Sequence, residues 1–278
     1  MTITAKIIAD SISAEGHRIT SVQLRYPKFI HGELMTHRVF SRNAASSRAI
    51  PVQRMIQDVK DDPAIPVHWG KNQKGMQADE EMSGPQIADL RGVWLEGRDK
   101  AIATATQLMA LGLHKQIANR VLEPWFHINT LVTATEWDNF FELRCHPDAQ
   151  PEMQTLANCI RSAMIESVPV MLEPGEWHLP YVDAAFLDTH TWALAQKISV
   201  ARCARVSFLT QEGTVPTVES DLELYERLVG ARPIHASPAE HQATPDSRYL
   251  SGTDDGVWRH AEQHRNFVGW RQYRAMID

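Results

Sequence analysis

The run THRVFSRNAASSRA, residues 36–49, concentrates groups that bind anions. His37, Arg38, Arg42 and Arg48 stand in it among serines and an asparagine. A guanidinium group presents a planar fork of donors that suits phosphate, and hydroxyl and backbone N–H groups complete such sites. Two interpretations follow: a pocket for a phosphorylated ligand, or a solvated surface turn.

A second group of polar side chains belongs to a predicted helix. Asn139 and Arg144 lie five residues apart on it, so both can line one cleft. Arg144 follows the apolar stretch FFEL, which places its charge near buried surface, where an unpaired charge is costly. We expect it to contact a carboxylate such as Glu142, or a ligand. Arg120, shortly before Pro124, is a further cationic candidate.

The segment HASPAEH, residues 235–241, holds two histidines together with Ser237 and Glu240. Histidine and carboxylate side chains bind metals. Pro238 would break a helix here, however, and no third kind of ligand is spaced nearby. We therefore do not expect a metal site.

Periodicity predicts the elements that position these groups. Alternation of apolar and polar residues predicts strands at 5–12 and 19–26, joined as a hairpin, and FIHGELMTHR reads as a short helix before the cationic run. Residues 51–85 are polar and are predicted to be an inserted loop, either a lid or a plain insertion. Further helices are predicted at 84–112, 114–124, 131–145, 150–165, 219–230 and 260–277, and a further strand at 198–208. The expected fold class is mixed α/β (α+β), a small antiparallel sheet packed with several long helices.

Composition narrows the class of protein. The 278 residues are 43% hydrophobic and 22% charged, with a formal net charge of −6, which argues against a general nucleic-acid binder. The three cysteines have no paired spacing, so we expect neither a disulfide framework nor a zinc site. No run is apolar enough for a membrane span or a signal peptide. We expect a soluble, cytoplasmic protein.

Five motifs together resemble the flavin-dependent thymidylate synthases. THRVFSRNAASSR resembles that family's signature R-H-R-x-x-S-x-N-E-x-S-x-R, and ANRVLEP resembles its Ala-Arg-x-x-Leu-Pro segment. DNFFELRCHPDAQPEMQ resembles the segment that carries its substrate arginine, with the spacing from asparagine to arginine kept. HASPAEH and ARCARVSF resemble two further segments, the latter an opening strand. In the family these last two come first, whereas here they come last, so we expect one catalytic domain, 1–278, with a circularly permuted order.

The resemblance implies FAD and NADPH as cofactors, methylenetetrahydrofolate as carbon donor, a pyrimidine deoxynucleotide monophosphate as substrate, and a homotetramer with pockets between subunits. Arg144 would contact the pyrimidine and stabilise negative charge at N3 as C5 becomes nucleophilic. No enzyme nucleophile is needed. Residues implied at the flavin are His37, Arg38, Asn139, Ser237 and Glu240, with His235 near flavin and folate. Residues implied at the nucleotide are Glu33, Ser46, Ser47, Arg48, Arg120 and Arg144.

The chain departs from the family pattern at several of these positions. The first arginine of R-H-R is Thr36, and the glutamate after the asparagine is Ala44. Glu33 replaces a glutamine, and Thr133 and Thr135 replace an asparagine and an arginine. A carboxylate at position 33 could accept from an exocyclic amine, which would suit cytosine.

Three functions are therefore open. The leading one is flavin-dependent transfer of a one-carbon unit to C5 of a pyrimidine deoxynucleotide, most simply dUMP to dTMP. An alternative is hydroxymethylation of dUMP or dCMP, in which water rather than hydride meets the exocyclic methylene. The other is a non-catalytic relative that binds flavin or nucleotide.

Overall fold

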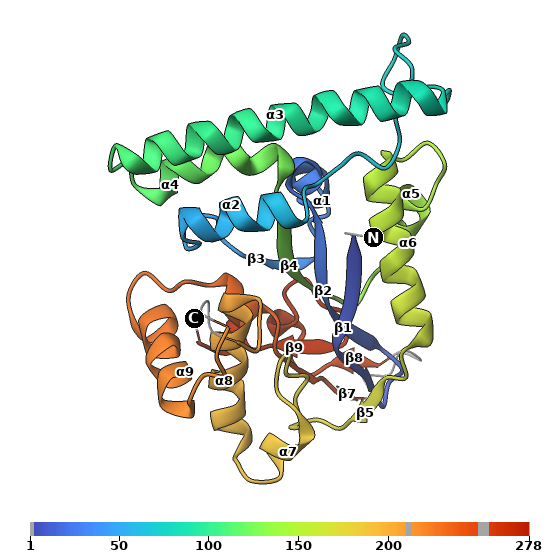
Figure 1. Ribbon diagram of the computed structural model, residues 1–278. Coiled ribbons are helices and arrows are strands. Elements are labelled where there is room, and N and C mark those ends of the chain that lie inside the picture. Colours follow the sequence, from blue (N-terminus) through green and yellow to red (C-terminus); the bar gives the residue numbers. More distant parts are fainter. Residues whose placement is uncertain (1–2, 210–212, 250–255, 278) are drawn as a thin grey trace.

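A five-stranded sheet forms the centre of the computed structural model, which describes residues 3–209, 213–249 and 256–277 (Figure 1). Strands β1 and β2 form the predicted hairpin, and β4 pairs with β2 and with β3; these pairs are antiparallel, whereas β5 runs parallel to β1. In spatial order the strands are β3 (Ser41–Ala44), β4 (His127–Ala134), β2 (Arg18–Pro27), β1 (Thr4–Ser13) and β5 (Val170–Leu172). The expected small antiparallel sheet is thus confirmed.

Helices cover one face of this sheet. Apolar residues of the central strands, among them Val22, Leu24 and Val132, are fully buried there against Met153 and Leu156. Figure 1 shows α6 beside β1 and the long helix α3 lying across one end of the sheet. The helices of this layer are α1 (His31–Leu34), α2 (Val52–Asp61), α3 (Gly84–Ala110), α4 (Lys115–Ala118), α5 (Asp138–Arg144) and α6 (Pro151–Glu166), with 3-10 turns η1 (Lys28–Ile30) and η2 (Asn119–Trp125).

The C-terminal elements contribute a second packing layer. Tyr181, Cys203 and Val206 pack against Leu131 of β4, and the Tyr181 hydroxyl donates to Oε1 of Gln23 over 3.0 Å. The helices are α7 (Ala184–Leu187), α8 (Trp192–Arg205), α9 (Val218–Tyr225) with a π-helical turn η3 (Glu226–Gly230), and α10 (Arg274–Ile277), and the 3-10 turns are η4 (Ser237–Glu240) and η5 (Ala261–Gln263). The short strands are β6 (Ala243–Pro245), β7 (Arg248–Tyr249), β8 (Val257–Trp258) and β9 (Trp270–Gln272).

Local signals explain the helices that were predicted well. Ser83 forms a capping box with Gln86 at the start of α3, and Gly112 follows its end with a φ of 79°. Pro151 occupies the first turn of α6, where its missing N–H group has no helical partner to lose. The helix predicted at 114–124 begins as α4 and continues as the 3-10 turn η2.

The element predicted as a strand at 198–208 is wrong, because these residues belong mostly to α8. Thr191 caps the helix by accepting from the Leu194 N–H group over 3.3 Å, and Val206 ends it with a left-handed φ of 57°. The apolar run is buried against neighbours on several sides, and such a run does not distinguish helix from strand by periodicity.

The helix predicted over 131–145 is also wrong in its first part. Residues up to Ala134 complete β4, which is paired on both sides, and only Asp138–Arg144 is helical. The last predicted helix, 260–277, is divided into η5, β9 and α10, with Gly269 at a φ of 77° between them. Residues 51–85, predicted as a loop, contain α2, whose buried Val52, Met55, Ile56 and Val59 follow helical spacing.

Candidate functional site

Arg144 is held by three of the predicted polar positions. Its Nε donates to Nε2 of His37 over 2.9 Å, and a second guanidinium nitrogen donates to the hydroxyl of Thr36 over 3.3 Å. A third nitrogen lies 3.6 Å from a carboxylate oxygen of Glu33. Because α1 carries Glu33 and α5 carries Arg144, the Arg144 side chain brings the predicted base-binding residues of the two helices together.

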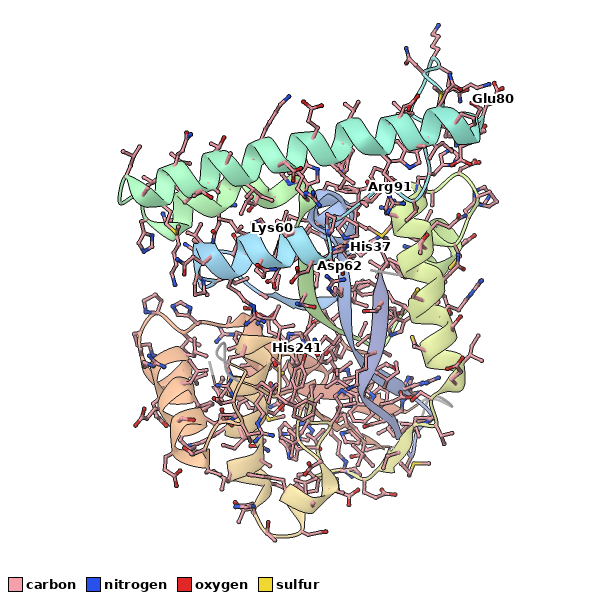
Figure 2. All side chains as sticks on the ribbon, viewed as in Figure 1. His37, Lys60, Asp62, Glu80, Arg91 and His241 are labelled. Carbon is pink, nitrogen blue, oxygen red and sulfur yellow. The ribbon has the colours of Figure 1, made fainter. Side chains whose placement is uncertain are left out.

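His37 is buried at the centre of this group. Its ring packs edge-on against Phe140 and is stacked on Phe40, and Figure 2 shows it beside α1. Burial lowers the pKa of His37, and the positive charges of Arg144 and Arg42 lower it further. Since Nε2 accepts from Arg144, the proton of the neutral ring lies on Nδ1. His37 therefore serves Arg144 as a neutral acceptor.

A cavity of about 500 Å³ lies next to His37. Asn139 lines it, together with the aromatic side chains of Trp137, Phe140 and Phe141. Such a mixture of aromatic walls and a few polar groups is typical of sites for planar ligands. Arg38, by contrast, is exposed on the connection that follows α1.

The loop after β3 forms a second group of predicted residues. Arg48 donates to the Ser46 hydroxyl over 3.4 Å, and the Ser47 hydroxyl donates to Glu123 over 3.5 Å. Arg120 forms an ion pair with the same Glu123 oxygen at 2.9 Å. The structure thus brings Ser46, Ser47, Arg48 and Arg120 to one place, where Glu123 supplies the negative charge. Asn119 holds the loop by donating to the carbonyl groups of Ser47 and Ile50 over 2.8 and 2.9 Å.

The C-terminal predicted residues lie at the edge strand β3. Ser237 donates to Oδ1 of Asn43 over 3.0 Å, and Asn43 donates to the Cys203 carbonyl over 2.6 Å. Glu240 attracts Arg42 electrostatically, which places its carboxylate near the same strand. His235 is exposed, and its backbone N–H donates to the Leu228 carbonyl over 2.8 Å. Among the described residues, its side chain forms no hydrogen bond or ion pair with the other predicted site residues.

A buried hydrogen-bonded chain was missed by the sequence analysis. It runs from Ser11 to His178 (3.0 Å), from His178 to Ser21 (2.9 Å), from Ser21 to Thr133 (2.5 Å) and from Thr133 to His241 (2.8 Å). Burial lowers the pKa of both histidines to about 3, so both rings are neutral. His241 lies among the C-terminal elements (Figure 2). His241 belongs to the HASPAEH segment and Thr133 to the departures from the family pattern, but neither signal indicated that the two side chains are in contact.

HASPAEH forms the 3-10 turn η4 and the residues on either side of it. Among residues 3–209, 213–249 and 256–277, no group of three or more histidine, cysteine or acidic side chains could hold a metal ion. His241 is instead engaged with Thr133.

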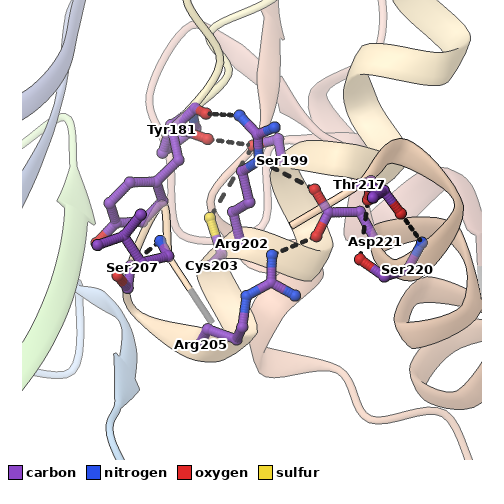
Figure 3. Close-up of polar contacts among 11 residues, drawn as sticks. Tyr181, Ser199, Arg202, Cys203, Arg205, Ser207, Thr217, Ser220 and Asp221 are labelled. Atoms are coloured by element: carbon purple, nitrogen blue, oxygen red, sulfur yellow. Dashed lines mark hydrogen bonds and ion pairs between the residues drawn. The ribbon is translucent and has the colours of Figure 1, made fainter. Parts of the chain in front are cut away.

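The two arginines of the ARCAR segment stabilise the fold by pairing with a buried carboxylate. Figure 3 shows Arg202 and Arg205 reaching the two oxygens of the fully buried Asp221, with Arg202 at 3.1 Å. Arg202 also donates to the Tyr181 carbonyl over 2.7 Å. The carboxylate therefore ties α9 to α8, and these two arginines are paired within the protein.

Comparison with known sequences decides the family. Residues 13–170 match the profile of the family described as "Thymidylate synthase complementing protein". The chain belongs to this family. The resemblance to flavin-dependent thymidylate synthases drawn from the motifs is thereby confirmed. The matched residues include Glu33, His37 and Arg144, whereas His235, Ser237 and Glu240 lie outside them.

Solved structures show the same fold. A UMP/dUMP methylase, PolB, from Streptomyces cacaoi with bound 5-Br UMP is 19% identical, with a TM-score of 0.50, and the match covers 61% of this chain and 90% of that one. The same enzyme with 5-Br dUMP is 17% identical, with a TM-score of 0.50, covering 61% and 91%. No curated protein matches the chain. In the described part of the chain, no helix has the length and hydropathy needed to cross a membrane.

Proposed function

We propose that this protein transfers a one-carbon unit from methylenetetrahydrofolate to C5 of a pyrimidine deoxynucleotide monophosphate, most simply converting dUMP to dTMP with FAD and NADPH. The convergence of Glu33, His37 and Arg144 carries the proposal. The similarity to a protein described as a UMP/dUMP methylase supports the substrate class.

Arg144 has the role of stabilising the pyrimidine as negative charge develops. The Arg144 side chain is 22% exposed, and His37 and Thr36 orient its guanidinium group. Little reorganisation is therefore needed when negative charge appears on a ligand. His37 fixes this orientation only as a neutral acceptor. Glu33 lies on the other side of the guanidinium and can accept from a base N–H group or an exocyclic amine.

The residues around the cavity fit a flavin. Trp137, Phe140 and Phe141 offer flat apolar surfaces, Asn139 offers amide hydrogen bonds, and His37 is neutral. The charged side chains that line the same cavity are Arg18, Glu136 and Asp138. These residues would hold the flavin, with Arg38, Ser237 and Glu240 completing the site, and His235 facing folate. FAD, when bound, supplies the redox chemistry.

Cysteine chemistry is not required by this scheme. Burial raises the pKa of Cys203 and of Cys159, which keeps both thiols protonated and poorly nucleophilic. The chain's own contribution is therefore orientation and electrostatic stabilisation.

The family side chains that this chain lacks suggest a second candidate function. Thr36 accepts from Arg144, Thr133 belongs to the buried chain, and the Thr135 hydroxyl accepts from the Val268 N–H group over 3.0 Å. At three positions where the family carries larger polar side chains, this chain thus has threonines that make hydrogen bonds within the protein. This observation favours a relative that holds its ligands differently, either as a hydroxymethylase of dUMP or dCMP or as a non-catalytic binder.

A product assay separates these functions. The purified protein is incubated with dUMP or dCMP, methylenetetrahydrofolate, FAD and NADPH, and the mass of the product nucleotide is measured by mass spectrometry. A methylated nucleotide supports the leading proposal, and a hydroxymethylated one supports the alternative. A colourless protein that neither takes up FAD nor alters either nucleotide would contradict both enzymatic functions.

The assembly is proposed from the same resemblance. In a homotetramer, a neighbouring subunit would bring a second set of loop residues 46–48 to each cavity. Sedimentation velocity tests this assembly directly, and a stable monomer that retains full turnover would overturn it.

A further inference from the structure

Arg42 is a half-buried cation with little internal compensation. It lies on β3, and one guanidinium nitrogen donates to the Met35 carbonyl over 2.6 Å. Within the described residues it forms no ion pair, although Glu240 attracts it electrostatically. A guanidinium has five N–H donors, so most of its donor capacity is unused in this arrangement.

The groups around Arg42 make its surroundings positive. The charge of Arg42 lowers the pKa of both His31 and His37, which helps to keep both rings neutral. Burial is the largest cause at His31, and together with Lys28 and Arg42 it lowers the pKa of that ring to about 4. Lys28 is itself half-buried, and burial lowers its pKa while Arg120 acts in the same direction. A row of cationic groups therefore connects the loop site at Arg120 with Arg144, and the carboxylates of Glu123, Glu240 and Glu33 act on it.

His31 offers a further donor beside Arg42. Its Nδ1 is hydrogen-bonded to the Tyr26 hydroxyl at 2.8 Å, and that hydroxyl also contacts the Thr130 hydroxyl at 2.9 Å. When Tyr26 donates to Nδ1, the ring proton lies on Nε2, which can then donate to a ligand. A bound anion would select this tautomer.

We propose that Arg42, with His31 beside it, binds a phosphate group of a ligand in the candidate site, an inference that rests on the proposed function. Arg42 is half-buried and has no carboxylate at ion-pair distance within the described residues, and phosphate oxygens match the fork of donors of a guanidinium. The phosphate belongs either to the pyrimidine nucleotide or to the pyrophosphate of a dinucleotide cofactor. Arg42 is thus a binding residue additional to Arg48 and Arg120.

Binding measurements with matched ligands test this assignment. The whole protein and its Arg42→Gln variant are titrated with dUMP and deoxyuridine, with FAD and riboflavin, and with inorganic pyrophosphate. Gln keeps a donor for the Met35 carbonyl and removes the charge. Arg161→Gln, at an exposed arginine on α6, is the matched control. Thermal midpoints close to the wild-type value establish that the variants are folded.

We expect Arg42→Gln to weaken binding of a phosphate-bearing ligand by about 10- to 100-fold, with deoxyuridine and riboflavin changed by less than about twofold. A loss confined to dUMP assigns the nucleotide phosphate, and a loss confined to FAD assigns the pyrophosphate. Equal affinities of wild type and Arg42→Gln for dUMP, FAD and pyrophosphate would overturn the inference.

The role of Arg42 in binding and the proposed reaction can fail independently of each other. If the protein converts no nucleotide but Arg42→Gln still weakens binding of dUMP, FAD or pyrophosphate, the anion site stands and the proposed reaction fails. If turnover is observed and the variant binds every ligand normally, the reaction stands and the role of Arg42 fails. Failure of the wild type to bind any phosphate-bearing ligand would overturn both.

Discussion

Arg144 donates a hydrogen bond from Nε to Nε2 of His37 over 2.9 Å, joining α5 to the connection after α1. A histidine nitrogen that accepts from an arginine carries no proton, so the His37 ring is neutral, and burial of His37 favours this form. The pair therefore fixes a guanidinium without neutralising its charge.

Replacing Arg144 by lysine is expected to remove turnover while sparing the fold. A lysine ammonium is a point charge and cannot hold His37, Thr36 and a ligand with one planar group. We expect kcat to fall roughly 100- to 1,000-fold, as is typical when one preorganised donor is lost. Steady-state kinetics with the folded variant measures the effect, and Arg161→Lys serves as the control. Unchanged turnover in Arg144→Lys would remove Arg144 from the mechanism.

Glu33 is expected to influence the choice of base. Its carboxylate lies 3.6 Å from Arg144 and accepts hydrogen bonds only, which suits the exocyclic amine of cytosine. Glu33→Gln adds an amide donor and should shift the ratio of kcat/KM for dCMP to that for dUMP toward dUMP by about tenfold. A ratio that does not move, or a ligand complex with Glu33 far from the base, would dispose of this role.

The buried histidines make stability depend on pH. The folded-state pKa of His178 and of His241 is about 3, below the ordinary value of 6.5. The unfolded state therefore binds more protons between these values, so the stabilisation is complete above pH 6.5 and is lost progressively as the pH falls. The two residues together should contribute a slope of about 3 kcal/mol per pH unit.

Urea unfolding between pH 7.5 and 5 would measure this slope. Other histidines with lowered pKa, such as His127 at about 4, add to it in the same direction. A His241→Gln variant should show a shallower decline. A free energy of unfolding that stays constant over this range would contradict neutral burial of the pair.

Asp221 is expected to stabilise the fold rather than the site. It is fully buried and paired with Arg202 and Arg205 (Figure 3), so Asp221→Ala leaves two cations without their partner. We expect a loss of about 3–5 kcal/mol in the free energy of unfolding. Asp99→Ala removes the exposed partner of Arg98 and should cost less than about 1 kcal/mol. Equal effects of the two substitutions would contradict the structural role of Asp221.

The sequence predicted well those elements whose signals are local. The alternation in 19–26 and the capping residues around α3 and α6 depend on neighbours in the chain. Residues 131–134 and 198–205 were assigned wrongly because tertiary pairing and burial decide their structure. The chain through His178 could not be predicted, since it joins residues more than 100 positions apart.

Motifs predicted the candidate site more fully than periodicity did. They identified Glu33, His37 and Arg144, which the fold brings together, whereas Arg42 was named only as one of the cations in residues 36–49 and has no assigned role in the family signature. The permuted order stays a prediction. It is supported by two contacts of Asn43 on β3, one from Ser237 and one to the Cys203 carbonyl, because they join the late motifs to the early one.

We propose that Arg144 and its neighbours act on the C5 position of a pyrimidine deoxynucleotide. Transfer of isotope from labelled methylenetetrahydrofolate, followed by mass spectrometry and NMR of the nucleotide, tests it most directly. We predict label on a carbon bonded to C5, in the presence of FAD and NADPH, and its loss in Arg144→Lys. Unlabelled dUMP and dCMP after incubation with a flavin-loaded, folded wild-type protein would contradict the account.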